Sequence, residues 1–333
     1  MKGCLIFLIF FFCNLLFSQQ LIDKLNNNLQ HALYNKNQFT GKIVFYSTDF
    51  NKEYWGNPEK INFDTLIYFD EDKNILLSAI SLNLFDDERF NINSYLNALI
   101  PGSTEPYLPN SDDYNIPFKN EMTAKDLLQQ RSGLFNIIDK YKFEHIKFLL
   151  ADSNCFVIID SMAAKISKGN LYNYDPNIRF KYNKFNFYLL LKILNRIKSE
   201  KIINEIEQHI KYLINKDNYK IGDLISFYNL AMYYKNLITN EMVIPKRLIN
   251  NYLLYPSPIN NYYIEYAMGC FYYKNIGYGN ISVNDNSVRI SVYLPKHDIF
   301  LLFYIFDLKI NKEDELNSKE IITLLELISK IEL

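Results

Sequence analysis

The chain has 333 residues, which is enough for one large domain or two smaller domains with a sizeable core. Hydrophobic residues make up 49% of it, so intrinsic disorder is excluded as its general state. The formal net charge of −1 gives no electrostatic basis for binding nucleic acid or an anionic membrane surface. The 27 tyrosines and 25 phenylalanines are spread along the whole chain, which indicates a compositional bias rather than an aromatic binding surface.

The first 19 residues have the pattern of a secretory signal peptide. Lys2 supplies a positive charge, and the following stretch Cys4–Phe17 is almost wholly apolar. This run has roughly 14 residues, whereas a membrane span needs about 20. Cleavage near Ser18-Gln19 predicts an exported chain, periplasmic or secreted, with no membrane span after cleavage. An uncleaved anchor is the alternative.

The cysteines and histidines show no metal-binding spacing. Cys4 and Cys13 lie in the predicted signal peptide, and lipidation at Cys13 stays open, although phenylalanines rather than small residues precede it. Cys155 and Cys270 remain in the mature chain, where export allows either a disulfide between them or two separate buried thiols. The four histidines are scattered, so we expect neither a metal nor a cofactor.

The first third of the chain alternates between helical and strand patterns. These patterns predict a helix over 21–34, strands over 41–47 and 53–56, and a helix over 73–85. Four of the ten prolines fall in 101–117, which predicts a loop. Thr123 is a predicted helix N-cap with Asp126 at the third helical position, and Ser132-Gly133 ends that helix.

The middle of the chain is helical and its end is rich in strands. Amphipathic patterns predict helices over 185–197, 202–214 and 223–237, then strands over 262–273, 287–293 and 299–306, and a closing helix over 318–331. Leu294–Asp298 is predicted to be the hairpin turn between the last two strands. This order predicts an α+β fold, in which both ends of the chain form one antiparallel sheet beside a mostly helical insertion.

The stretch Met122–Leu134 is the most informative part of the sequence. It resembles the T-x-x-x-L-L-x-x-x-S-G-L segment of the serine β-lactamase and penicillin-binding-protein-like family. Weaker matches keep the family's order, among them Phe39-Thr40-Gly41, Phe180-Lys181-Tyr182 and Tyr266–Gly269. The resemblance implies a β-lactamase-like domain over 20–333, in which terminal helices flank the sheet. Its sheet region would take in about 20–68 and 217–333, and its helical region about 69–216.

The first catalytic motif of this family is Ser-x-x-Lys, which occurs nowhere in this chain. Alignment on Thr65-Leu66-Ile67 puts Asp70 at the serine position and Lys73 at the lysine position. A carboxylate is a weak nucleophile whose attack on an amide would give a reactive anhydride, and it would keep Lys73 charged. The alternative interpretation is an acidic helix start, which the helix dipole favours.

The other two motifs are also incomplete. The Tyr-x-Asn motif corresponds to Tyr182-Asn183-Lys184, which keeps the tyrosine and replaces the asparagine. The Lys/His-Thr/Ser-Gly motif aligns with Asn280-Ile281-Ser282, which lacks both the basic residue and the glycine. The resemblance therefore gives the following candidates: Asp70, Lys73 and Tyr182 as catalytic positions, and Lys184, Asn280 and Ser282 as cleft residues.

Motifs of the scaffold survive in this chain while motifs of the chemistry do not, which is the pattern of a pseudoenzyme. The leading hypothesis is an exported, catalytically inactive member of the family that binds a cell-wall peptide or a protein partner. The alternative is an active serine-type hydrolase (esterase, peptidase or β-lactamase-like) with a rearranged nucleophile. Ser78 and Ser81, on the same predicted helix as Lys73, are the nearby hydroxyls for that chemistry. A protein that kept the fold only for structure or interaction is the third hypothesis.

Overall fold

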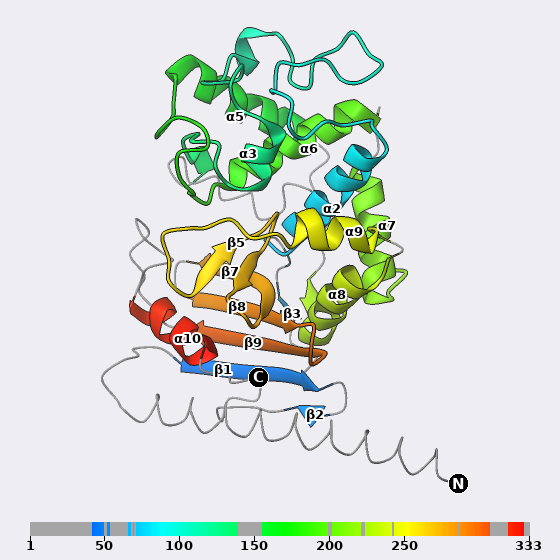
Figure 1. The fold of residues 1–333 in the computed structure, drawn as a ribbon, viewed down its shortest axis with the longest axis vertical. Coiled ribbons are helices and arrows are strands. Elements are labelled where there is room, and N and C mark those ends of the chain that lie inside the picture. The colour runs from blue at the N-terminus through cyan, green and yellow to red at the C-terminus, as the bar shows by residue number, and fades with distance from the viewer. Residues whose placement is uncertain are drawn as a thin grey trace. The chain divides into compact units, whose positions relative to one another are not determined.

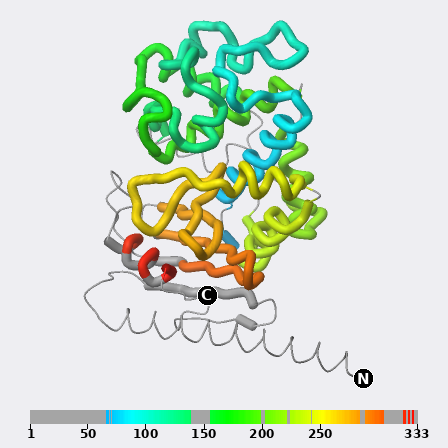
Figure 2. Tube along the Cα trace, viewed as in Figure 1, coloured from blue at the N-terminus to red at the C-terminus, as the bar shows by residue number. Residues whose placement is uncertain are grey.

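The computed structural model describes residues 42–49, 52–53, 66–67, 69, 71–138, 155–198, 202–220, 224–241, 243–284, 287–306 and 319–329. The predicted signal peptide and the predicted helix over 21–34 lie outside these residues. The chain divides into two compact units. The sheet unit takes in Met1–Thr65, Asn261–Glu265 and Phe271–Leu333, and the helical unit takes in Leu66–Asn260 and Tyr266–Cys270. Figure 1 labels the elements, and Figure 2 follows the chain by colour.

Seven strands make up the main sheet, in the order β2-β1-β9-β8-β7-β6-β5. Their bounds are β1 Lys42–Asp49, β2 Lys52–Glu53, β5 Ile264–Tyr266, β6 Phe271–Tyr273, β7 Gly277–Asn284, β8 Ser287–Leu294 and β9 Ile299–Phe306. β1 pairs antiparallel with β9, and Ser47 lies opposite Leu301, so an early strand lies beside the last one (Figure 1). This pairing confirms the prediction that both ends of the chain form one antiparallel sheet.

β8 and β9 form a hairpin at the predicted turn. The His297 amide donates to the Leu294 carbonyl at 3.2 Å, and Asp298 takes the left-handed conformation at φ 53°. The Tyr293 hydroxyl donates to the Asp298 carboxylate at 2.9 Å, which holds the turn closed. All residues of β9 from Ile299 to Phe303 are buried, and since strand side chains alternate, both faces of this strand are covered.

The predicted strand over 262–273 is interrupted in the structure. β5 ends at Tyr266 and β6 begins at Phe271, with a tight turn between them in which the Ala267 amide donates to the Cys270 carbonyl at 2.8 Å. Gly269 within this turn has φ +85°, a conformation that side chains rarely tolerate. The sequence pattern missed the break because the apolar residues continue through the turn.

Among the described helices, α10 (Lys319–Ser329) belongs to the sheet unit and the others belong to the helical unit. The helical unit also contains a short two-stranded sheet of β3 (Leu66–Ile67) and β4 (Ile225–Ser226). Its longer helices are α2 Lys73–Asp86, α5 Cys155–Gly169, α6 Lys184–Lys198, α7 Ile202–Ile214 and α8 Phe227–Thr239. Its shorter ones are η1 Asp112–Tyr114, α3 Ala124–Leu128, α9 Lys246–Leu248 and the π-helical turn η3 Ile249–Leu253. Most of α2 is buried around its whole circumference, so it is the central helix of this unit.

Three helix assignments differ from the sequence prediction. The helix predicted over 223–237 begins later, at Phe227, because Ser226 has an extended backbone and its hydroxyl caps the Asn229 amide at 3.2 Å. α5 was not predicted, although its buried residues repeat at helical spacing on one face: Cys155, Ile159, Met162, Ala163 and Ile166. The helix predicted from Thr123 to Ser132-Gly133 ends earlier, at Leu128, and Gln130 just after it takes the left-handed conformation at φ 58°. The remaining predicted helices within the described residues are confirmed to within two residues at each end.

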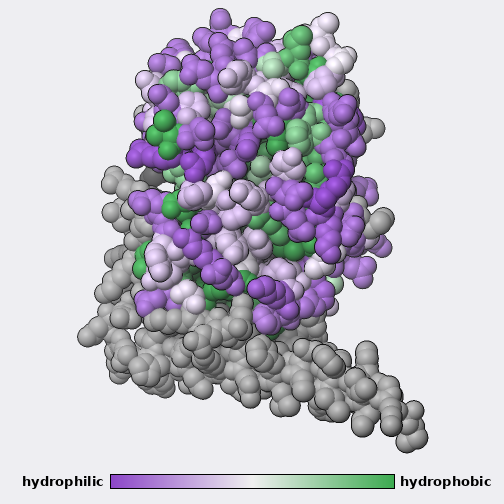
Figure 3. Space-filling model, in the orientation of Figure 1, coloured by the Kyte–Doolittle hydropathy of each residue, from purple (hydrophilic) through white to green (hydrophobic). Residues whose placement is uncertain are grey.

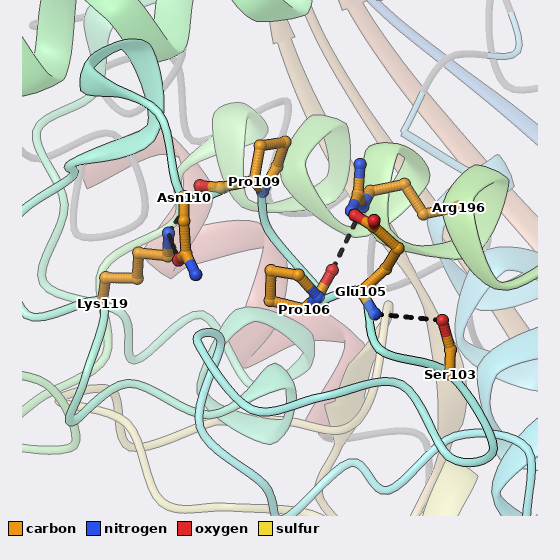
Figure 4. A network of polar contacts seen from close by, with 7 residues as sticks. All are labelled: Ser103, Glu105, Pro106, Pro109, Asn110, Lys119 and Arg196. Atoms are coloured by element: carbon orange, nitrogen blue, oxygen red, sulfur yellow. Dashed lines mark hydrogen bonds and ion pairs between the residues drawn. The ribbon is translucent and has the colours of Figure 1, made fainter.

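The proline-rich segment 101–117 is a loop with one short turn of helix, and side chains from elsewhere hold it (Figure 4). Arg196 of α6 donates to the Pro106 carbonyl at 3.2 Å and pairs with Glu105 at 3.0 Å. The buried Lys119 ammonium donates to the Pro109 carbonyl at 2.6 Å and to the Asn110 side chain at 3.2 Å. The loop is therefore anchored at two points by cations.

Large apolar side chains on the surface are dispersed. The most exposed of them come from separate parts of the chain: Val157, Ile178, Tyr255 and Tyr262. On the face drawn in Figure 3, hydrophobic residues form small groups among hydrophilic ones. No helix among the described residues is both long and apolar enough to cross a membrane.

Candidate functional site

Four consecutive polar residues are buried where the chain enters α2. The exposed fractions of Glu71, Asp72, Lys73 and Asn74 are 8%, 0%, 3% and 9%. The rest of α2 packs into an apolar core, so a run of buried charges at its start needs partners. Their partners include Tyr182 just before α6, the first residue of α6 and two tyrosines of α8, and these partners divide the four residues into two sets.

One set faces the second motif. The Asn74 side-chain amide donates to the Tyr182 hydroxyl at 3.1 Å, and the Lys184 ammonium pairs with the Glu71 carboxylate at 2.6 Å. Glu71 and Asn74 are three residues apart, which puts both on one side of the helical turn that begins α2. The structure therefore brings together Glu71, Asn74, Tyr182 and Lys184, of which the sequence alignment named only the last two.

The other set is turned toward different neighbours. Asp72 accepts hydrogen bonds from two tyrosines of α8, through its carboxylate from Tyr234 at 2.6 Å and through its carbonyl from Tyr233 at 3.0 Å. The Lys73 ammonium lies 5.7 Å from the centre of the Phe69 ring. Asp70 lies outside the described residues, so its assignment to the serine position stays a prediction.

Tyr182 is positioned by Gln130, a fully buried residue in the left-handed conformation at φ +58°. The Gln130 carbonyl accepts from the Lys181 amide at 3.0 Å, and its side-chain oxygen accepts from the Asn183 amide at 2.7 Å. These two bonds hold the backbone on both sides of Tyr182. The same oxygen accepts from the Asn186 side chain at 2.9 Å, which links Gln130 to α6.

The segment Thr123–Leu134, which contains Gln130, is itself held in place by hydrogen bonds. Thr123 and Asp126 form the predicted capping box at the start of α3, with bonds of 3.2 Å and 2.7 Å between side chain and backbone. The Ser132 hydroxyl donates to Asn186 at 2.6 Å and accepts from the Leu134 amide at 3.2 Å. The strongest sequence match is therefore a structural support for the second motif.

The electrostatic environment keeps Tyr182 protonated. Burial raises the pKa of its hydroxyl well above the ordinary value of 10.0, the Glu71 carboxylate raises the pKa further, and the hydrogen bond from Asn74 opposes the increase. A phenol with such a pKa is not a phenolate at neutral pH, so it has little capacity to accept a proton. It remains able to donate a hydrogen bond.

The two serines considered as rearranged nucleophiles lie inside the core. Ser78 and Ser81 have no exposed surface, and their hydroxyls donate to carbonyls one helical turn earlier, at Asn74 (3.0 Å) and Leu77 (2.8 Å). Serine commonly makes this bond within a helix. Neither hydroxyl is presented to a substrate in this structure.

The third-motif residues Asn280 and Ser282 lie on β7 of the sheet unit and are buried. The Asn280 amide donates to the Ser291 hydroxyl of β8 at 3.1 Å, and the Asn280 carbonyl accepts from the Tyr273 hydroxyl at 3.2 Å. Gly279 just before it lets the strands approach closely, because a side chain there would meet the Ser291 carbonyl at 1.8 Å. Among the described residues, no group of three or more His, Cys, Asp or Glu side chains could hold a metal ion.

Comparison with known proteins gives a fold but no sequence relative. No protein-family model matches the sequence, and no curated protein matches it. A D-stereospecific amidohydrolase from Streptomyces sp. is similar in structure, with TM-score 0.62 and 13% identity over 86% of this chain and 94% of the other. A D-amino acid amidase from Ochrobactrum anthropi SV3 has TM-score 0.63 and 9% identity over 94% and 97% of the two chains.

Two further structures extend this likeness to a penicillin-binding protein homologue and a β-lactamase/D-alanine carboxypeptidase. An octameric penicillin-binding protein homologue from Pyrococcus abyssi has TM-score 0.61 and 13% identity, and it covers 92% of this chain and 76% of its own. A β-lactamase/D-alanine carboxypeptidase from Pseudomonas syringae has TM-score 0.59 and 10% identity over 93% and 98%. The mixture of helices and antiparallel sheet described above is thus the fold of the serine β-lactamases and penicillin-binding proteins, and the chain adopts it.

Proposed function

We propose that this protein binds its ligand without forming a covalent intermediate, as a non-hydrolytic protein with the serine β-lactamase fold. The observation that carries the proposal is the ion pair of Glu71 and Lys184 beside Tyr182. In hydrolases of this fold class, the tyrosine of the second motif works on a serine hydroxyl. Here a carboxylate and an amide face that tyrosine instead.

The chemistry of these groups supports the proposal. A carboxylate is a poor nucleophile toward an amide, and an ammonium that is paired with it holds its proton. Tyr182 is held in its protonated form, so no group of this cluster is set up to activate a hydroxyl. Loss of a general base alone typically lowers the rate about 10²–10⁴-fold, and loss of the nucleophile removes the covalent route.

We also propose that the chain is exported and that its partner is a cell-wall peptide or a protein of the same compartment. The apolar stretch after Lys2 supports export. Mass spectrometry of the mature protein from the native host tests this part, and we expect the first residues, up to near Gln19, to be missing. An intact N-terminus in the purified protein would contradict it.

The test of the non-covalent function is the intact mass of the folded protein after incubation with a fluorophosphonate and, separately, with a penicillin. We expect no adduct with either reagent. A working serine hydrolase treated in parallel confirms that the reagents are active. A stoichiometric adduct, mapped to one serine by digestion, would overturn the proposal, and so would ester hydrolysis that disappears in Tyr182→Phe.

A further inference from the structure

The ion pair between Glu71 and Lys184 is unequal. The Glu71 side chain is 9% exposed and precedes the central helix, whereas the Lys184 side chain is 37% exposed and reaches from the first residue of α6. A lysine on its flexible four-carbon stem changes position at little cost, while a carboxylate at the start of a buried helix does not. The carboxylate is therefore the fixed member of the pair, and the ammonium is the member that can leave.

We propose that Glu71 is the anchor for the primary ammonium group of a ligand, and that Lys184 is the internal cation which holds this place until the ligand arrives. This inference rests on the non-covalent function proposed above and names the chemical class of its ligand. A buried carboxylate that loses its cation is strongly destabilising, so an exchange must supply another cation. A primary ammonium replaces the Lys184 ammonium like for like, with the same charge and the same three donors.

The neighbours of the pair suit an ammonium that is attached to a hydrogen-bond acceptor. The Tyr182 hydroxyl accepts from the Asn74 amide, and among the described residues none accepts the proton of this hydroxyl. Its raised pKa keeps that proton in place. The hydroxyl can thus donate to a carbonyl next to the ligand's ammonium, as in an amino-acid amide or the amino end of a peptide. Glycinamide, which carries both groups, is the smallest probe of this kind.

The experiment is chemical rescue of a variant without the internal cation. Lys184→Ala takes the ammonium away from Glu71, and we expect a lower melting temperature than that of the wild type. Ethylammonium and glycinamide should restore roughly half or more of this loss, with saturation, because they bind only the folded state. Tetramethylammonium at the same ionic strength has no N–H donor and should restore nothing.

Two control variants separate a specific exchange from a general salt effect. Glu71→Gln combined with Lys184→Ala removes the anchor, so the amines should not stabilise it. Lys192→Ala is the matched control on the same helix, because Lys192 also pairs with a carboxylate, Asp160, at 2.7 Å. There the exposure is reversed, 16% for the lysine and 40% for the carboxylate, so water solvates the carboxylate that remains and added amines should have little effect.

The outcomes decide the inference in either direction. A saturable rescue of Lys184→Ala that is absent from both controls supports it. Equal stabilisation of the three variants, or no response of Lys184→Ala, overturns it. If Lys184→Ala does not fold, Lys184→Met retains the apolar stem and takes its place in the same titration. A covalent adduct of the wild type would contradict the proposed function. Intact mass measures the adduct, and this measurement is separate from the rescue.

Discussion

Glu71 and Asn74 face Tyr182 from the start of α2, although the sequence alignment put Asp70 and Lys73 at the catalytic positions. Each residue of a helix is rotated by about 100° from the one before it, so a shift of one position changes the neighbour completely. Lys73 attracted the alignment because it is the lysine at the expected distance from Thr65-Leu66-Ile67. The sequence also offered Glu71 and Asn74, a second pair of polar residues three positions apart. Only the position of Tyr182 in the fold shows which of the two pairs faces it.

A pair of variants tests which register faces the tyrosine. Glu71→Ser with Asn74→Lys rebuilds Ser-x-x-Lys on the side of Tyr182, while Asp70→Ser alone rebuilds it with the natural Lys73. We expect the first variant to gain a slow adduct with a fluorophosphonate, because a serine beside a lysine and a tyrosine is an activated nucleophile. Asp70→Ser should remain inert. Intact mass spectrometry measures both, and an adduct only on Asp70→Ser would reverse our assignment.

Gly269 packs directly against the backbone at the start of α2. A side chain there would lie 2.5 Å from the Asn74 carbonyl, and the backbone has φ +85°. Gly269→Ala should therefore lower the free energy of unfolding by about 2–4 kcal/mol, from steric overlap and backbone strain together. Gly102 also has a positive φ of +74° but has nothing within 4 Å, so Gly102→Ala should cost only about 1 kcal/mol. Urea unfolding of both variants checks this, and equal losses would contradict it.

At the scale of elements, the helical unit is held together by polar bonds as well as by apolar packing. Gln130 joins the segment after α3 to the start of α6, and the Asp160 carboxylate joins α5 to Lys192 of α6. The long loop over 101–117 is anchored through Arg196 and Lys119. Loops of this length within a compact unit need such anchors, because they contribute little apolar burial of their own.

Lys119 makes the stability of this loop depend on pH. Burial lowers the pKa of its ammonium from the ordinary 10.5, and the Arg196 charge lowers it further. The unfolded chain therefore keeps this proton to a higher pH than the folded chain does. The folded state is penalised while Lys119 is charged, and this penalty is relieved as pH rises through the folded pKa toward 10.5.

Lys119→Met removes this dependence. As the pH rises through the folded pKa of Lys119 toward 10.5, the unfolding free energy of the wild type should therefore rise relative to that of Lys119→Met. Denaturant melts at a series of pH values measure the difference. Lys125→Met, at an exposed lysine of the adjacent helix α3, serves as the control and should show no such trend. A difference that falls with pH would contradict the assignment.

At the scale of the whole molecule, export and cysteine content can be examined together. The mature chain would keep Cys155 and Cys270, and the sequence allowed either a disulfide or two thiols. In the structure both are buried free thiols. Burial also raises the pKa of Cys270, so its reactive thiolate is scarce at neutral pH.

The folded mature protein should therefore react negligibly with Ellman's reagent, and two thiols should appear when it is unfolded in guanidinium. A reducing agent should leave the unfolding midpoint unchanged, since there is no cross-link to break. The two cysteines need no variant for this test, because the same sample is measured folded and unfolded. One thiol or none after unfolding would contradict this expectation and show that the two cysteines are joined or modified.

The sequence by itself determined the fold class and most of the element order. The apolar run over 299–306 indicated a strand, and the residues Thr123 and Asp126 specified a capped helix start by local bonds. These features are local in the chain, so pattern and propensity suffice for them. The resemblance of the segment Met122–Leu134 to the family is also a local feature, because it lies within one continuous stretch of the chain.

The tertiary structure decided which of these residues meet. Tyr182 lies 108 positions from Asn74, and Lys184 likewise reaches back to Glu71, so no local pattern could pair them. Ser78 and Ser81 read as candidate hydroxyls in sequence, and only the packing around α2 showed that they are core residues. The turn at Gly269 could not be predicted for the same reason, since Gly269 packs against the Asn74 backbone, which is distant in the sequence. The physical cause is common to all three: a buried side chain is defined by what surrounds it, and the surroundings come from distant parts of the chain.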